Sequence, residues 1–310
     1  MGSHEKFSYG ATNKEETMEL RHIRYFLAIA EEMNFTRAAE KLCIAQPPLS
    51  RQIQDLENEL GTKLFVRSPH HLELTEAGEI FRQYGARILE LSEKSVEDIR
   101  EMDNGLQGTI YFSNVEGHAP SLLAKWISEF QKEYPNVKYN LWNGNTDDII
   151  SRIKKGLCDL AIIMTPFDPE GIETFPVYEE PWVAIMPTDH PLAGEEGDSI
   201  ELKKLAPYDL VIPSRHSRLH EIEDWFAISG TKPKVRCYIA HTLSAYELTR
   251  QGVGIAIYPA SASDIIAKDS LCIKAISNPQ VMAKYVLAWN QEKTMSKATE
   301  KFLEFVKGKK

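Results

Sequence analysis

The chain has 310 residues, of which 43% are hydrophobic and 26% are charged, and its formal net charge at pH 7 is -9. This length allows two or three domains, and the composition is ordinary for a soluble globular protein. No apolar run approaches the ~20 residues that span a bilayer, and no cleavable signal segment is visible, so we expect a cytoplasmic protein with no membrane partner. The net charge excludes a surface that is basic overall, so any contact with phosphate must depend on local cations.

The first 17 residues are polar, and we interpret them as a disordered extension or an artefact. A helical pattern starts at Met18 and runs to Glu31. Its apolar residues recur at helical spacing and fall on one face: Leu20, Ile23, Phe26, Leu27 and Ala30. We therefore expect an ordered domain from residue 18, whose first helix packs by this face.

Residues 33–53 predict two short helices around a tight connection. Thr36 is placed to accept a hydrogen bond from the first free amides of the earlier helix. Pro47 and Pro48 suit the first turn of the later helix, where the amide protons would be unpaired anyway. Small and apolar side chains supply the packing positions of this segment: Ala38, Ala39, Leu42 and Ile44.

The later helix has two different faces. Its apolar face holds Leu49, Ile53 and Leu56, and its polar face holds Ser50, Arg51 and Gln54. One face packs while the other offers hydrogen-bond donors and acceptors, and a helix-turn-helix recognises a DNA major groove in this way. The pattern therefore predicts that the protein binds double-stranded DNA.

The segment that follows predicts a wing. Gly61 comes directly after Leu60 and is a common stop for a helix. Residues 63–67 and 72–75 have the pattern of two short strands, joined by residues 68–71. We expect a winged helix-turn-helix domain over residues 18–75.

Residues 18–78 resemble the amino-terminal domain of the LysR-type transcriptional regulators. The resemblance rests on Phe35–Ala39, on Ala45–Ile53, on Leu60-Gly61 with Leu64-Phe65, and on Leu74-Thr75 with Ala77-Gly78. His70 stands in the wing, where relatives commonly carry an arginine. The resemblance implies that these residues contact DNA: Thr36, Arg37, Gln46, Pro47, Pro48, Ser50, Arg51, Gln54, Arg67 and His70.

The predicted DNA-binding domain is not basic. Between residues 18 and 78 there are seven Lys and Arg residues against nine Asp and Glu residues. Specific binding requires local cations rather than a global excess, and Arg37, Lys41, Arg51 and Arg67 could share one surface. We expect each subunit to contribute modestly, so that several subunits are needed for useful affinity.

Residues 76–107 predict a long linker helix followed by a hinge at residues 104–108. A mostly apolar seam steps by three and four residues along it: Ile80, Tyr84, Ile88, Leu91, Ser95, Ile99 and Met102. A single seam between charged faces favours a partner helix, and the alternative is a solitary core helix. The family resemblance likewise implies a linker that dimerises the chain, in a homodimer that goes on to form a homotetramer.

Residues 108–310 alternate strand and helix patterns, which favours parallel sheets with covering helices. We expect strands over 109–113, 137–142, 160–164, 182–186, 210–212, 235–239 and 255–258, and helices over 119–133, 146–155, 219–229 and 243–251. The segment resembles the two-lobed, periplasmic-binding-protein-like effector domain of the family. We assign residues 108–180 and 268–310 to lobe I and residues 181–267 to lobe II.

A small molecule is expected in the cleft between these lobes. Sheets of this type bind ligands beyond the carboxyl ends of strands and at the amino ends of helices. Relatives place hydroxyl side chains at most of these points, and Thr146 and Ser214 match that pattern. Gly117 departs from it, with Glu116 and His118 on either side.

Cationic groups crowd the predicted cleft and favour an effector with a carboxylate, which a guanidinium can bind through two hydrogen bonds. In the alternative interpretation, Arg218 only pairs with Glu221 or Asp224, and His118 points to solvent. The candidate effector-binding residues are Gly117, His118, Thr146, Ser214, Arg215, His216, Arg218, His241 and Thr242.

Catalytic motifs are missing from the sequence. His216 and His220 are four residues apart, but His216 is expected to precede the helix and no third metal ligand is apparent. There is no Gly-x-Ser-x-Gly elbow and no phosphate-binding loop. We therefore expect no metal, no cofactor and no enzymatic activity.

Two alternatives to an effector-controlled regulator stay open. In the first, the regulator senses oxidation through Cys158 and Cys237, which lie in the sensory half. The other cysteines are Cys43 and Cys272. The simplest interpretation of all four is that they are buried residues in a reducing cytosol. In the second, the cleft belongs to a solute-binding module or an enzyme, which would have no need for a helix that binds the major groove.

Overall fold

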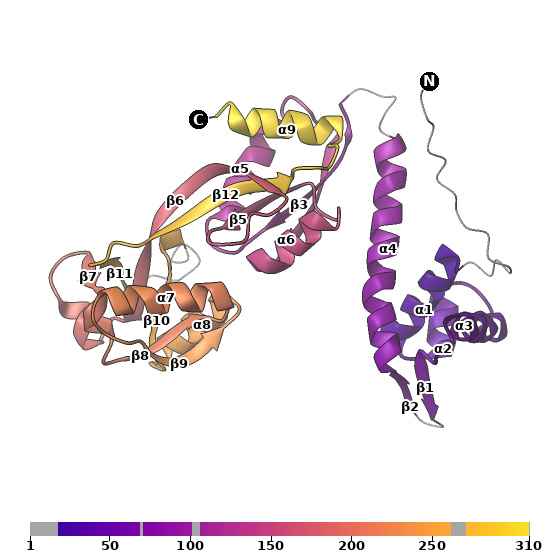
Figure 1. Ribbon diagram of the computed structural model, residues 1–310, viewed down its shortest axis with the longest axis horizontal. Helices are drawn as coiled ribbons and strands as arrows, with labels where there is room; N and C mark the ends of the chain where they lie inside the picture. The colour runs from indigo at the N-terminus through magenta and orange to yellow at the C-terminus, as the bar shows by residue number, and fades with distance from the viewer. Residues whose placement is uncertain (1–17, 69–70, 101–105, 262–270, 310) are drawn as a thin grey trace, which may run out of the picture. The chain divides into compact units, whose positions relative to one another are not determined.

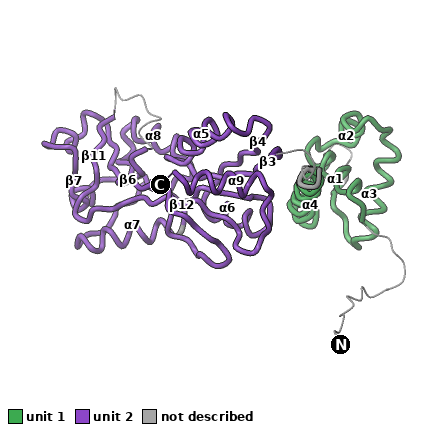
Figure 2. Tube along the Cα trace, turned by 90° about the horizontal axis from the view of Figure 1, so that it is seen from above, with its two compact units in different colours: residues 1–96 green, residues 97–310 purple. Residues whose placement is uncertain are grey.

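The computed structural model describes residues 18–68, 71–100, 106–261 and 271–309. The chain divides into two compact units, residues 1–96 and residues 97–310 (Figure 2). Within the described ranges, no helix combines the length and the apolar content that crossing a membrane requires. The extension at residues 1–17, His70 in the wing, and Met102 and most of the hinge lie outside the described residues.

The first unit is the predicted winged helix-turn-helix with its long helix (Figure 1). Its core is formed by the apolar faces of the first three helices and by the wing, with Phe26, Ile29, Leu49, Ile53 and Leu56 almost completely buried. The elements in chain order are α1 (Leu20–Glu32), α2 (Phe35–Lys41), α3 (Gln46–Leu60), β1 (Phe65–Ser68), β2 (His71–Leu74) and α4 (Glu76–Arg100).

The prediction that Thr36 caps α2 is wrong. Asn34 is the N-cap, and its side-chain oxygen accepts hydrogen bonds from the amides of Thr36 at 2.9 Å and Arg37 at 3.1 Å. Asn34 lies outside the helix with an extended backbone, which lets its short side chain turn back to the free amides. Thr36 already lies in the first turn, so its own amide is one of the groups that need a cap.

Helix α3 begins and ends as its sequence predicts. Pro47 and Pro48 lie in its first turn, and Gly61 ends it with a left-handed backbone (φ 68°). A buried carboxylate then ties the helix to the wing, because Glu57 accepts hydrogen bonds from the amides of Leu64 (3.0 Å) and Phe65 (3.3 Å). The wing is therefore fixed to the helix that carries the polar face.

Helix α4 leaves much of its apolar seam uncovered within its own chain. The exposed fractions are 53% for Ile80, 59% for Tyr84, 37% for Ile88 and 46% for Leu91. The side chain of Ile99 lies outside the described residues. Large apolar side chains in a row on a helix surface indicate a partner, so the pattern supports the predicted linker rather than a solitary core helix.

The second unit has the two predicted lobes, but each is built on a mixed sheet and not on the expected parallel one, because β12 and β6 run antiparallel to their neighbours. In lobe I the strand order is β4 (Val137–Asn143), β3 (Gly108–Asn114), β5 (Leu160–Met164), β12 (Met282–Asn290) and the first part of β6 (Ile172–Pro187). The helices that pack on this lobe are α5 (Ala119–Phe130), α6 (Thr146–Lys154) and α9 (Lys297–Lys307).

Lobe II continues from the second part of β6. Its sheet runs from β6 to β10 (Ile255–Pro259), β8 (Asp209–Pro213) and β9 (Lys234–Ile239), with β11 (Leu271–Ser277) and β7 (Ser199–Glu201) on a branch. Its helices are α7 (His216–Ile228) and α8 (Thr242–Arg250). Two turns of 3-10 helix, Pro191–Gly194 and Leu202–Leu205, complete it.

The two lobes share strand β6, which is visible as a long ribbon between them in Figure 1. Its residues 172–181 pair with β12 in lobe I, whereas residues 182–185 pair with β10 in lobe II. The sequence predicts only residues 182–186 as strand, because the half-exposed first part lacks a continuous apolar run. One uninterrupted strand therefore connects the lobes beside the cleft.

Besides the start of β6, three boundaries differ from prediction by three residues or more. Helix α7 starts at His216 instead of residue 219, so His216 does not precede the helix, and α5 ends at Phe130 instead of residue 133. Strand β11 pairs with β6 and β7 in lobe II, so the return to lobe I follows residue 277 and not residue 268. Single apolar strands carry no local signal of the sheet they will join, and this explains the last error.

We predict that Gly78→Ala destabilises the first unit. A Cβ at this position would lie 2.2 Å from the carbonyl oxygen of Leu64, so α4 and the wing would have to separate. We expect the free energy of unfolding to fall by about 1–3 kcal/mol in chemical denaturation. Gly194→Ala is the control, because nothing lies within 4 Å of its Cβ position. Equal stability of the two variants would contradict this account of the packing.

Candidate functional site

The first candidate site is the polar face of α3. Leu49, Ile53 and Leu56 are buried in the domain, whereas Arg51 and Gln54 are exposed and Ser50 is half-buried. Gln46, Pro47 and Pro48 are also exposed, at the amino end of the same helix. The predicted division into a packing face and a polar face is therefore present.

Two cations of α2, Arg37 and Lys41, already have acidic partners. The guanidinium of Arg37 donates to the carbonyl oxygen of Glu32 (2.5 Å), and Lys41 lies 2.9 Å from Glu31 and 3.3 Å from Glu32. Both cations remain largely exposed, so phosphate can reach them, but it must compete with these carboxylates. Thr36 is exposed beside Arg37. Arg67 lies in β1 with its side chain outside the described residues.

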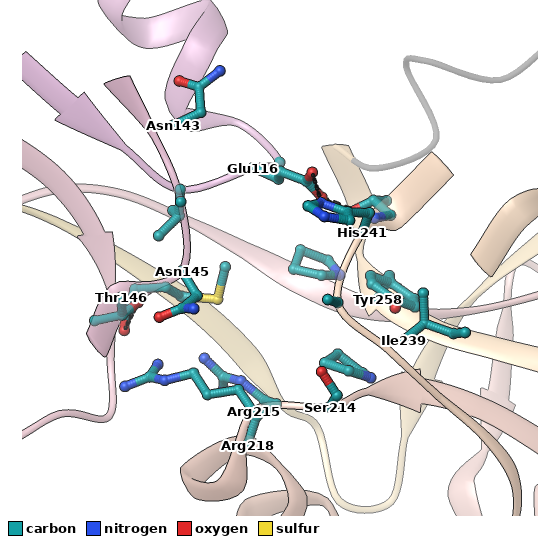
Figure 3. Close-up of a pocket in the computed structure, with 18 of the residues that line it drawn as sticks. Glu116, Asn143, Asn145, Thr146, Ser214, Arg215, Arg218, Ile239, His241 and Tyr258 are labelled. Atoms are coloured by element: carbon teal, nitrogen blue, oxygen red, sulfur yellow. Dashed lines mark hydrogen bonds and ion pairs between the residues drawn. The ribbon is translucent and has the colours of Figure 1, made fainter. Parts of the chain in front are cut away.

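The second candidate site is a cavity of about 600 Å³ between the lobes of the second unit. The loops that follow β3, β4, β8 and β9 line it, and these are the four loops that the sequence predicts around a ligand. Its apolar wall is formed by Trp142, Met164, Trp182, Ile239 and Tyr258. Figure 3 shows two of them, Ile239 and Tyr258, near His241. The volume lies within the range of small-molecule sites.

Seven of the nine predicted effector residues line this one cavity: Gly117, Thr146, Ser214, Arg215, Arg218, His241 and Thr242. The structure does not bring His118 to it, because the imidazole stacks on the ring of Tyr178 with centroids 3.8 Å apart. His216 is the first residue of α7, and its side chain lies outside the described residues. In Figure 3, the arginines and Ser214 lie opposite Glu116 and His241.

Gly117 has a geometric reason to be glycine. Its φ of +89° is one that other residues rarely adopt, and an added Cβ would lie 2.5 Å from the hydroxyl oxygen of Tyr285. That same hydroxyl accepts a hydrogen bond from the amide of His118 at 3.4 Å. Tyr285 therefore occupies the space into which a serine or threonine side chain would project.

Arg215 connects the two lobes. From the start of α7 its Nε and Nη2 atoms donate to the carboxylate of Asp147 in α6, at 2.7 to 3.1 Å, and Nη2 also donates to the carbonyl oxygen of Pro166 at 3.0 Å. A fork of this kind fixes the guanidinium plane as well as its position. The arginine is therefore held at the cavity wall before any ligand arrives.

Arg218 is the buried cation of the site, with 4% of its surface exposed. It pairs with Glu221, as the alternative interpretation of the sequence expected, and it also lines the cavity. Its Nη2 donates to the carbonyl oxygen of Thr165 across the lobes (2.7 Å), and the guanidinium lies over the ring of Trp182. Burial lowers the pKa of Arg218 despite the nearby carboxylate of Glu221.

Glu116 makes the other connection between the lobes. From the loop after β3, its carboxylate accepts hydrogen bonds from the amide of Thr242 at 2.8 Å and from the Thr242 hydroxyl at 2.6 Å, and it lies 3.2 Å from Nδ1 of His241. Burial opposes ionisation of this carboxyl, but the hydrogen bonds from Thr242 and His241 outweigh it and hold the pKa of Glu116 below its usual value.

Two polar atoms in the cavity wall lack partners among the residues that the structure describes. They are the hydroxyl oxygen of Tyr258 and the indole nitrogen of Trp182, and these residues are 5% and 1% exposed. Buried polar groups are normally hydrogen-bonded, so unpaired ones beside a cavity indicate where a ligand or water would bind. Burial raises the pKa of Tyr258, which keeps its hydroxyl protonated and able to donate.

Metal and redox chemistry find little support in the described part of the chain. No group of three or more His, Cys, Asp or Glu side chains there is arranged to hold a metal ion. The four cysteines are not disulfide-bonded, and Cys158 is completely buried, whereas Cys43 is exposed. Reactive cysteines generally require access to the oxidant, which Cys158 lacks in this conformation.

Family models match both parts of the chain. The bacterial regulatory helix-turn-helix protein, lysR family, matches residues 20–79, and the LysR substrate binding domain matches residues 103–310. The chain belongs to the LysR family of transcriptional regulators. It is therefore a DNA-binding regulator with an effector-binding domain, and its relatives are regulators rather than enzymes.

Individual LysR-type relatives cover most of the chain. The Hca operon transcriptional activator HcaR of Escherichia coli K12 is 35% identical over 246 residues, which are 78% of this chain and 82% of HcaR. The regulator CatR of Pseudomonas putida is 37% identical over 250 residues, 79% of this chain and 83% of CatR. Full-length CbnR in complex with its target DNA is similar over 94% of this chain and 100% of CbnR, with a TM-score of 0.78 and 27% identity.

The sequence predicts the cleft of this LysR-type chain but not three of its features. It indicates Glu116 only as a neighbour of Gly117, although a carboxylate in a loop beyond a strand is a possible helix cap. Asp147 and the aromatic wall residues Trp182 and Tyr258 were also missed. The pairing of Asp147 with Arg215 joins residues that are 68 positions apart, so no local pattern could reveal it.

We predict that Arg51→Ala reduces the sequence preference of DNA binding. An exposed guanidinium on the polar face of α3 can form two hydrogen bonds with a guanine, and such a contact contributes about 1–3 kcal/mol of discrimination. The measurement is a comparison of affinities for a selected DNA site and for random DNA at fixed salt. Arg82→Ala is the control, because it removes an exposed arginine that pairs with Glu79 on α4. Full sequence preference in the Arg51 variant would refute this role for α3.

Proposed function

We propose that this LysR-type regulator responds to a small carboxylate-bearing effector that binds in the cavity between the lobes and alters how the protein holds DNA. Arg218 supports the carboxylate, because a buried guanidinium lines the cavity with its Nη atoms fixed by Glu221 and Thr165. The Ser214 and Thr146 hydroxyls and the unpaired Tyr258 hydroxyl add hydrogen-bonding groups around an apolar wall. This combination suits an organic acid with an apolar body.

Control of DNA binding requires that the effector bind two arrangements of the protein with different affinities. The two arrangements would be a closed and an open pair of lobes. The lobes meet through side-chain contacts, which can break, and share a continuous strand, which keeps them connected. A ligand that touches both lobes changes the free energy of their closure. Its carboxylate would be bound by Arg218 and by the amino end of α7, where free amides attract anions.

The DNA-binding form is proposed to be a homodimer through α4 that assembles further into a homotetramer in the cytoplasm. The exposed apolar seam of α4 supports the dimer, because a partner helix would cover Ile80, Tyr84 and Leu91. The acidic first unit supports a larger assembly, since each DNA-binding domain has few free cations for phosphate.

A redox-sensing function remains the second proposal, with Cys158 and Cys237 as the candidate cysteines. Cys237 is the better placed, because its side chain is half-buried and Cys158 is completely buried. Peroxide treatment that changes neither the DNA footprint nor the thiol count would exclude this proposal.

We predict that one or more small carboxylic acids raise the unfolding temperature of the full-length protein. A ligand at a hundred times its dissociation constant adds about 2.7 kcal/mol to the stability of the domain that binds it. The stabilisation should be lost in Arg218→Ala, because that variant removes the buried guanidinium from the cavity wall. Arg236→Ala is the matched control, since Arg236 is exposed on β9 and pairs with Asp209.

A broad panel of aromatic and aliphatic acids without any shift would contradict a carboxylate effector. It would favour a neutral effector or the redox proposal. A shift that persists in Arg218→Ala would place the bound acid outside this cavity.

A further inference from the structure

The amino end of α8 holds a carboxylate that belongs to the chain itself. Glu116 reaches it from lobe I and accepts hydrogen bonds from the backbone amide and the hydroxyl of Thr242. His241 supplies a third polar contact from the residue before the helix. An amide, a hydroxyl and an imidazole at a helix amino end are the groups that a bound organic acid would use.

The charges of the cavity make this contact unusual. Arg215 pairs with Asp147, and Arg218 pairs with Glu221. Neither arginine is paired with Glu116, whose partners among the described residues are Thr242 and His241. Hydrogen-bond donors and the helix end compensate this carboxylate, so the amino end of α8 functions as an anion site.

A second observation shows that the surrounding wall is built for a ligand. The hydroxyl of Tyr258, which is 5% exposed and lines the same cavity, has no partner among the described residues. Its ring packs against Tyr246 of α8, with centroids 6.2 Å apart. The donors at the end of α8 are thus occupied from within the chain, whereas a buried polar group of the adjoining wall is left for another molecule.

We propose that Glu116 is an internal ligand of the anion site at the amino end of α8, which closes the cleft when no effector is bound and which an effector carboxylate displaces. The competition makes Glu116 a residue that determines specificity. An acid that reaches α8 must replace three polar contacts of Glu116, so acids too short to do so bind only at the arginine side. The displacement step rests on the proposed carboxylate effector, whereas the internal-ligand role does not.

The test is chemical rescue with acetate in the full-length protein. Glu116→Ala removes the internal carboxylate and leaves the donors of Thr242 and His241 unpaired, which lowers the unfolding temperature. We expect potassium acetate to stabilise this variant saturably, relative to potassium chloride at equal ionic strength, and to restore more than half of the lost unfolding temperature. The wild-type protein should respond less than this variant, because Glu116 fills the site at α8 and leaves acetate only the arginine side of the cavity.

Glu247→Ala is the matched control. Glu247 is an exposed carboxylate of α8 that pairs with Arg250 and does not line the cavity, so its removal changes the net charge equally without opening the amino end of α8. We expect its acetate response to equal that of the wild type. Equal responses of wild-type and Glu116→Ala proteins, including no response in either, would overturn the proposal.

A second variant keeps the proposal testable if Glu116→Ala does not fold. Glu116→Gln preserves the volume of the side chain but removes its charge, and it should accelerate hydrogen exchange of the Thr242 amide. Unchanged exchange at this amide would also overturn the proposal. If no acid of the panel stabilises the protein but acetate still rescues Glu116→Ala, the carboxylate effector is rejected and the role of Glu116 as an internal ligand stands. The two proposals can therefore fail separately.

Displacement itself has a direct readout once an acid long enough to reach α8 from the arginine side stabilises the wild-type protein. That acid should bind Glu116→Ala about ten-fold more tightly, which corresponds to 1.4 kcal/mol of removed competition. Weaker binding to this variant would show that Glu116 assists the acid instead of competing with it, and would overturn the displacement step.

Discussion

The carboxylate of Glu116 crosses from lobe I to the amino end of α8 in lobe II, and the guanidinium of Arg215 crosses in the opposite direction to Asp147. Each contact provides hydrogen-bond partners for a charged group that would otherwise face an open cleft. Each also includes a group in contact with solvent, because the side chains of Glu116 and Asp147 are 46% and 61% exposed. Exposed contacts of this kind contribute about 0–1 kcal/mol each, so these two stabilise the closed arrangement only modestly.

A small stabilisation of the closed arrangement suits a regulator that must change when a ligand binds. A ligand well above its dissociation constant contributes about 2.7 kcal/mol, which exceeds the stabilisation expected from a single exposed contact. The lobes themselves stay intact, because strand β6 is continuous, one buried core extends through both lobes and a second lies within lobe II. Binding can therefore change how the lobes meet without unfolding either of them. The exposed seam of α4 offers a surface through which two chains would combine their DNA-binding domains.

Local patterns in the sequence predicted most of the fold. The proline pair at the start of α3, the glycine at its end and the strand-helix alternation after residue 108 each reflect short-range constraints. Errors occurred where a choice depended on distant residues. The cap of α2 is Asn34, two residues before the predicted Thr36, and β11 belongs to the sheet of lobe II because it pairs with β6.

The candidate cleft was predictable for a similar reason, because strands of a parallel sheet bring their following loops to one edge. The contact between Glu116 and Thr242 inside the cleft was not predictable. Glu116 and Thr242 are separated by 126 positions, and only the closed fold brings this carboxylate to a helix end. Glu116 and His118 lie on either side of Gly117. Glu116 lines the cleft, whereas His118 stacks on Tyr178. Residue type alone could not separate these two outcomes.

The most direct measurement of the central claim is the DNase footprint of full-length protein without any effector, on a DNA fragment that the wild-type protein has enriched from a random pool. Opening the cleft from within, by Glu116→Ala, should change the length of the footprint or the affinity for this fragment, whereas Glu247→Ala, which removes an exposed carboxylate outside the cavity, should behave as the wild type. Identical footprints and affinities for wild type and both variants would show that closure of the cleft does not control how the protein holds DNA.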